Sequence, residues 1–198
     1  GMFLRASAFN GDISKWDVSS VTEMKGMFAA AEMFNGDLSK WYVSSVINMN
    51  QMFNGAKEFN SDISKWDVSS VTLMTSMFNS ATSFNCDISN WDVSSVTNMN
   101  YMFLQASSFQ HQLCRPPWVY SKASKIRMFA GSAGSTSLTV CTAAFLSRES
   151  LKDAVVTCLK VSPKCDGSRC SHGPIADWKV SGVTNMENIF DGASSFNG

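Results

Sequence analysis

The sequence predicts an α/β repeat solenoid built from 25-residue coils. A segment that runs from residue 9 to residue 28 returns with little change from Phe34, Phe59 and Phe84. The tryptophans recur 25 residues apart, at Trp16, Trp41, Trp66 and Trp91. A period of about 20 to 50 residues is typical of solenoids and related arrays. One unit of this size cannot bury its own apolar face, so stability must come from stacked copies that cover one another.

Each coil is expected to contain a short parallel strand and a short helical turn. The pattern Ile-x-x-Trp-x-Val, as at 13–18, contains residue types that favour strands. The pattern Met-x-x-Met-Phe-x-x-Ala, as at 24–31, has the spacings of three and four that suit one or two helical turns. Stacking would align identical side chains in columns, with the methionines filling the core. The expected core residues are Trp16, Trp41, Trp66, Trp91, Phe28, Phe53, Phe78 and Phe103.

The repeated motif FNGDISKWDVSSVTEMKGMF resembles the BspA-like leucine-rich-repeat surface proteins, the DUF285 repeat family. The resemblance covers about residues 1–113 and 178–198. It implies a leucine-rich-repeat-like solenoid that is usually exported and has a role in surface attachment or interaction. In this chain Leu is rare, and Trp, Val, Met and Phe take its places.

The repeat pattern divides the chain into four expected segments. Residues 1–108 form the end of a first array, because the chain starts within a repeat and then runs through four full periods. Residues 109–145 are a degenerate closing cap, in which the spacing changes and two prolines follow each other. Residues 146–177 are a helical opening cap. Residues 178–198 are the first, truncated unit of a second array, because Trp178 lies 87 residues after Trp91 and is out of phase.

An amphipathic helix is predicted over 147–160. Ser147 suits the N-cap, and Pro163 ends the helix. Spacings of three and four place one set of apolar residues on a single face, namely Leu151, Ala154, Val155, Cys158 and Leu159. We expect this face to cover the open core of the second array.

Composition and charge exclude several classes of partner. The formal net charge is zero, only 16% of residues are charged, and no basic stripe is present. Nucleic acid is therefore not an expected partner. No apolar run is long enough to span a membrane. No cofactor is expected, and the expected partner is a protein or glycan whose identity the sequence does not give.

Six cysteines indicate an oxidising compartment, and hence an extracellular or cell-surface location. Cys86 lies in a repeat turn. The disulfide candidates cluster between the two arrays and are Cys114, Cys141, Cys158, Cys165 and Cys170. The preferred pairing joins Cys114 to Cys141, and Cys158 to Cys165 or Cys170, although spacing alone leaves other pairings open. Cys165, Cys170 and His172 could also form part of a zinc site.

Two columns of aspartates recur with the repeat. One follows the turn, at Asp12, Asp37, Asp62 and Asp87, and the other follows the tryptophan, at Asp17, Asp67 and Asp92. Like charges one coil apart repel each other, so something must compensate them. The first column either accepts hydrogen bonds from turn N–H groups or holds a ladder of calcium ions. Neighbouring lysines or solvent would weaken the repulsion within the second column.

The leading functional hypothesis is a non-catalytic repeat module, secreted or at the cell surface, for protein or glycan interaction or adhesion. A passive spacer or stalk is an alternative. An enzyme is not expected, because the catalytic sequence motifs are missing; its site would need His111, Cys114 and His172. Three positions depart from the repeat, at Tyr42, Ile47 and Leu73, and two of them add exposed apolar surface that is either a contact spot or sequence drift.

Overall fold

The computed structural model describes residues 1–138, 140, 148–161, 175, 178, 180 and 183–191. The regular elements among them are β1 (Gln112–Leu113), α1 (Pro116–Val119), β2 (Ser135–Thr136) and α2 (Arg148–Val161). The chain divides into two compact units. The first comprises Gly1–Leu113 with Ser121–Thr136, and the second comprises Cys114–Tyr120 with Ser137–Gly198.

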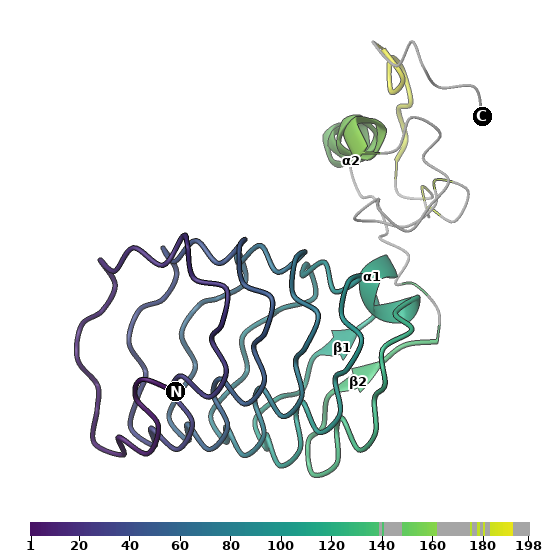
Figure 1. Cartoon of the computed structure of the whole chain (residues 1–198). Helices are drawn as coiled ribbons and strands as arrows, with labels where there is room; N and C mark the ends of the chain where they lie inside the picture. Colours follow the sequence, from purple (N-terminus) through teal and green to yellow (C-terminus); the bar gives the residue numbers. More distant parts are fainter. Residues whose placement is uncertain are drawn as a thin grey trace. The chain divides into compact units, whose positions relative to one another are not determined.

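In the first unit the chain winds as successive coils that lie side by side in sequence order (Figure 1). Parallel backbone bridges link the same position in five coils, at Glu23, Asn48, Leu73, Asn98 and Ser124. At the last coils β1 and β2 form a parallel pair, in which Gln112 lies opposite Ser135. The repeat period therefore sets the register from coil to coil.

The segment expected to be helical, Met24–Ala31 and its copies, is a ribbon of tight turns. Alternate N–H groups close turns within the coil, and those of Met27, Ala29 and Ala31 each donate three residues back. The intervening N–H groups donate to the next coil; that of Phe28, for example, donates to the carbonyl of Met52 at 2.9 Å. The prediction of helical turns is wrong, because a helix would use all these donors internally and leave none for the neighbouring coil.

Left-handed backbone at two places in each coil makes this alternation possible. The first place has φ between 50° and 60°, at Gly26, Gln51, Ser76, Tyr101 and Arg127. The second has φ between 56° and 77°, at Arg5, Ala30, Gly55, Ser80, Gln105 and Gly131. This conformation costs a residue other than glycine about 1–2 kcal/mol. The hydrogen bonds between coils therefore offset strain that recurs in every repeat.

We expect Gln51→Gly to raise the free energy of unfolding by about 1 kcal/mol, because glycine adopts the left-handed conformation without strain. Gly55→Ala should lower it by a similar amount. At Gly55 φ is +72°, and an added Cβ would meet only ordinary contacts, the nearest being the Cα of Ala30 at 3.7 Å. Urea unfolding of both variants measures the two changes. If both substitutions changed the free energy of unfolding in the same direction, the left-handed backbone assigned to these positions would be contradicted.

The expected strands at 13–18 and its copies are also wrong. The N–H of Trp16 donates to the carbonyl of Ile13 at 3.1 Å, and the N–H of Val21 donates to the carbonyl of Val18 at 2.9 Å. The segment thus makes two tight turns, which still point Ile13 and Val18 inward, since they are 4% and 5% exposed. The alternation of apolar and polar residues that predicted a strand is produced here by turns.

Aromatic rings fill the coil stack in columns. One phenylalanine column stacks at centroid distances of 5.3–5.7 Å and contains Phe28, Phe53, Phe78, Phe103 and Phe129. A second column stacks at 5.7–6.1 Å and contains Phe9, Phe34, Phe59, Phe84 and Phe109. The indole N–H groups of Trp41, Trp66 and Trp91 each donate to a carbonyl 28 residues earlier, as Trp66 does to Leu38 at 3.0 Å. Trp41, Trp66 and Trp91 are 3%, 4% and 1% exposed.

Trp16 differs from the other three and corrects the expected core. Its side chain is 42% exposed. The indole contacts Phe3 at a centroid distance of 5.8 Å. In the coil stack, the tryptophans of the second, third and fourth coils are buried against the complete coil that precedes each of them.

A fifth coil follows the four complete periods, through residues 109–113 and 121–134, and β2 starts the next coil, where it pairs with β1. The N–H of Phe78 donates to a carbonyl 24 residues ahead, that of Met102, whereas the N–H of Phe103 donates 25 residues ahead, to Met128. One inserted residue therefore explains the shifted spacing, and the ladder continues through it. Whether 109–145 acts as a closing cap stays a prediction.

In the second unit the predicted helix is present as α2. Its described inward residues form one core with the restarted repeat, in a cluster of Leu151, Ala154, Val155, Cys158, Trp178, Val183 and Ile189. The restarted repeat keeps the local backbone of the first array, because Asn188 has φ of 56° and corresponds to Tyr101, 87 residues earlier. Packing of a helix on a first coil is what an opening cap requires, and that role stays a prediction.

Candidate functional site

The recurring aspartates are engaged in local turns. The Asp12 carboxylate accepts a hydrogen bond from the N–H of Ser14 at 2.9 Å. The Asp67 carboxylate accepts from both the N–H and the hydroxyl of Ser69, at 3.1 and 2.6 Å. Equivalent bonds occur at Asp17, Asp37, Asp62, Asp87 and Asp92. These carboxylates therefore stabilise the turns of each coil by accepting hydrogen bonds.

The serine bonds lower the pKa of the turn aspartates. The pKa of Asp12 and of Asp37 lies below the usual value because of the serine hydroxyl first and the serine N–H second, with a smaller contribution from the neighbouring lysine. The pKa of Asp62 is lowered by the same two donors of Ser64. Hydrogen bonds to the charged form favour ionisation, so the like charges of the column are compensated mainly by these donors.

We expect the coil stack to lose stability in acid. A carboxyl group with a lower pKa in the folded state binds fewer protons there, so its stabilisation is complete above the unfolded pKa of about 3.9 and is lost as pH falls through the folded value. The melting temperature should be constant above about pH 5 and fall below about pH 4. A triple variant, Ser14→Ala, Ser39→Ala and Ser64→Ala, should show a shallower fall in thermal melts. An equally steep fall would contradict the role of the serines.

Asparagines form a ladder along the same turns. The side-chain oxygen of Asn10 accepts from the N–H of Asn35 at 2.9 Å, and that of Asn35 accepts from the N–H of Asn60 at 2.8 Å. The ladder continues through Asn85 to the N–H of Gln110. The invariant asparagine thus links coils and, like the aspartates, is explained by the fold.

The aspartate column carries no sign of a metal centre in the part of the chain that the structure describes. There, no three His, Cys, Asp or Glu side chains come together to hold a metal ion. The carboxylates of Asp12, Asp37, Asp62 and Asp87 each already accept from a serine two residues on. The calcium ladder stays a prediction of the sequence. Melting curves in millimolar calcium and in chelator test it.

The residues proposed for an enzyme site do not show a catalytic arrangement where they can be described. One ring nitrogen of His111, Nε2, lies 2.9 Å from the carbonyl oxygen of Asn85, and the ring tilts against that of Phe109. His111 therefore joins two coils at the position where other copies carry Gly, Ser or Cys. His172 lies outside the described residues.

The cysteines divide into two groups. Cys86 is a free thiol whose pKa is raised chiefly by burial, and its Sγ lies 3.8 Å from the Asp62 carboxylate. Cys114 and Cys158 are not among the free thiols. The partners suggested for them, Cys141, Cys165 and Cys170, lie outside the described residues. The pairing therefore stays a prediction.

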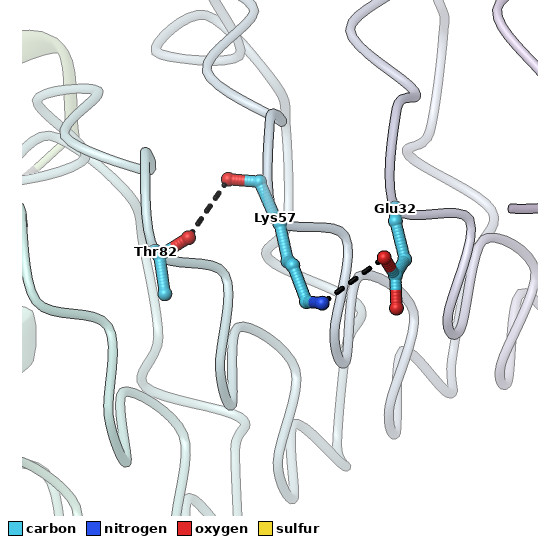
Figure 2. Close-up of polar contacts among 3 residues, drawn as sticks. All are labelled: Glu32, Lys57 and Thr82. Atoms are coloured by element: carbon cyan, nitrogen blue, oxygen red, sulfur yellow. Dashed lines mark hydrogen bonds and ion pairs between the residues drawn. The ribbon is translucent and has the colours of Figure 1, made fainter. Parts of the chain in front are cut away.

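Other exposed positions vary from coil to coil. One such column carries Glu32, Lys57 and Thr82 on three adjacent coils (Figure 2). Lys57 Nζ lies 3.0 Å from the Glu32 carboxylate, and the Thr82 hydroxyl donates to the Lys57 carbonyl at 3.2 Å. Both members of the ion pair are about half exposed, so the pair contributes about 1 kcal/mol or less. This column shows that the outer surface tolerates different chemistry in each coil.

A hollow of about 640 Å³ opens on the second and third coils. Its lining residues are Ser39, Lys40, Trp41, Tyr42, Val43, Ser44, Lys65 and Asp67. Tyr42 is 76% exposed, whereas Trp41 and Val43 are buried beneath the surface. Of the other two apolar departures, Ile47 is 46% exposed and Leu73 is half-buried, and neither lines this hollow. Sequence reasoning had noted Tyr42, and the structure adds the lysines that surround it.

No helix in the described ranges has the length and apolar character that crossing a membrane requires. The sequence matches a family described as "Mycoplasma protein of unknown function, DUF285" over residues 1–69, 38–139 and 165–198. Comparison with curated proteins and with solved structures finds no match.

Proposed function

The chain belongs to the DUF285 family, and from this premise we propose that it is a non-catalytic module that binds a protein or a glycan through the outer surface of its coils. We also propose that it is a BspA-like protein, with coils of a variant leucine-rich-repeat type. Support for the second statement comes from the parallel bridges that run from Glu23 to Ser124.

One observation carries the binding proposal: the invariant polar residues are used by the fold. The Asp–Ser turns and the asparagine ladder recur in every complete coil. Chemical selectivity must therefore lie in positions that vary, such as Tyr42 and the column of Glu32, Lys57 and Thr82. Exposed positions of this kind, repeated along an extended surface, suit weak contacts that add by avidity.

A binding screen tests the proposal. The full chain, verified as folded by a cooperative melt, is applied to arrays of matrix proteins and of neutral and acidic glycans. We expect a saturable interaction that weakens when the variable surface residues of the second and third coils are replaced by those of the fourth. A folded chain that binds none of these partners would contradict the proposal and favour the passive spacer.

We place the module at the cell surface or outside the cell as part of the same proposal. Two disulfides, from Cys114 and Cys158 to partners nearby in sequence, would leave two of the six thiols free, one of them Cys86. Thiol titration in denaturant without reductant should then find two reactive groups per chain, and six after reduction. Six reactive thiols without reductant would contradict an oxidising location.

A further inference from the structure

The hollow at Tyr42 lies where one coil departs from the repeat. At the same position the other complete coils carry Asp17, Asp67 and Asp92, and each accepts hydrogen bonds from the N–H and hydroxyl of the serine two residues later. Tyr42 has no carboxylate to offer, and within the described residues Ser44 makes no equivalent bond. The second coil therefore presents an exposed phenol ring and leaves the Ser44 N–H and hydroxyl available to a ligand.

The charge around this ring favours an anion. Lys40 and Lys65 line the hollow against one carboxylate, that of Asp67, which already accepts two hydrogen bonds from Ser69. Within the described chain the ion pair found joins Lys57 to Glu32, so neither lysine of the hollow is held within 4 Å of a carboxylate. The fourth coil carries Asn90 at the lysine position. Each lysine attracts the turn carboxylate three residues earlier, Asp37 or Asp62, without an ion pair within 4 Å, and tyrosine together with two such lysines occurs at one place in the stack.

We infer that this hollow binds an acidic saccharide, a pyranose ring that carries a carboxylate or sulfate group. The apolar face of a pyranose fits the flat, exposed ring of Tyr42. The hydroxyls of Ser39 and Ser44 can bond sugar hydroxyls, and the ammonium groups of Lys40 and Lys65 can pair with the acidic group. The volume of about 640 Å³ suits one or two sugar rings. This inference rests on the proposed binding function and names its ligand class.

The experiment measures affinity of the full chain for oligogalacturonate and a sulfated heparin oligosaccharide, with a maltooligosaccharide of matched length as the neutral probe. The variants copy residues found in other coils: Tyr42→Asp restores the common residue, and Lys40→Asn copies the fourth coil. Each should weaken acidic-saccharide binding by about tenfold, since each removes one of the main contacts. Asp92→Tyr, which adds an exposed ring beside Asn90, is the matched control and should create no new affinity.

The outcomes separate this inference from the broader proposal. Selective binding of an acidic saccharide that Tyr42→Asp and Lys40→Asn both weaken supports it. If the folded chain binds another partner in the screen but none of the acidic saccharides, this inference fails and the binding function stands. If an acidic peptide such as polyglutamate binds equally well and with the same dependence on Tyr42, the saccharide assignment is overturned.

Discussion

Trp66→Ala should lower the free energy of unfolding of the coil stack by about 3–5 kcal/mol. The Trp66 side chain is 4% exposed and lies between the second and fourth coils, with its ring 6.4 Å from that of Trp91. Truncation would leave a cavity there and would also remove the donor to the Leu38 carbonyl. The Leu38 carbonyl keeps a second hydrogen bond, from the N–H of Trp41 at 3.1 Å, so the cavity accounts for most of the cost. Because coils contact only their neighbours, a defect in the third coil weakens the interfaces on both of its sides.

Trp16→Ala is the matched control, because it removes the same side chain from the same coil position. Trp16 is 42% exposed, whereas Trp66 is 4% exposed and donates its indole N–H to the Leu38 carbonyl. We expect a loss below about 1.5 kcal/mol. Urea unfolding, followed by the fluorescence of the remaining tryptophans, measures both variants. Equal losses would contradict the difference in burial between the two tryptophans.

The contrast between these two tryptophans shows what the sequence can predict. A strict period and its apolar positions indicate which side chains face inward, and the rings of Phe53 and Phe78 do stack in register. The period does not reveal that equivalent tryptophans differ in burial from coil to coil. Trp16 occupies the same motif position as Trp66, and only its place in the stack exposes it.

The backbone of the coil was harder to predict, for a physical reason. The spacing of Met24, Met27 and Phe28 fits a helical turn. It fits equally well a ribbon of tight turns in which an N–H donates to the carbonyl three residues earlier. Left-handed residues distinguish the two, and at those positions the chain carries residues such as Gln51 and Tyr101, whose types give no local signal. Glycines appear there in some copies only, so the signal was scattered over several coils.

The candidate site, like the backbone, could be predicted from the sequence only in part. Recurrence of aspartate predicted either turn bonding or calcium, and the structure gives each carboxylate a serine donor. Tyr42 was visible as a departure from the repeat. The hollow depends in addition on Lys65, which lies one period after Lys40 and reaches the same place through stacking. A residue that departs from the repeat can be recognised as part of a site only when the residues beside it in the adjacent coil are known.

Val155→Asp should unfold the core of the second unit and leave the coil stack intact. Val155 is 1% exposed and packs in the cluster that joins α2 to Trp178, Val183 and Ile189. An unpaired carboxylate there costs at least about 3 kcal/mol, which exceeds what a small core of this size can lose. We expect the helical signal of α2 to disappear from far-UV circular dichroism, and proteases to cut beyond residue 137.

Val156→Asp provides the control, because it makes the same chemical change one residue further along the same helix. Val156 is 37% exposed and does not belong to the core cluster, so the helical signal should persist. In both variants the main melting transition should stay within about 2 °C of the parent, because each compact unit has its own core and a repeat array is stabilised by neighbouring coils. Loss of that transition in Val155→Asp would show that the two units fold as one.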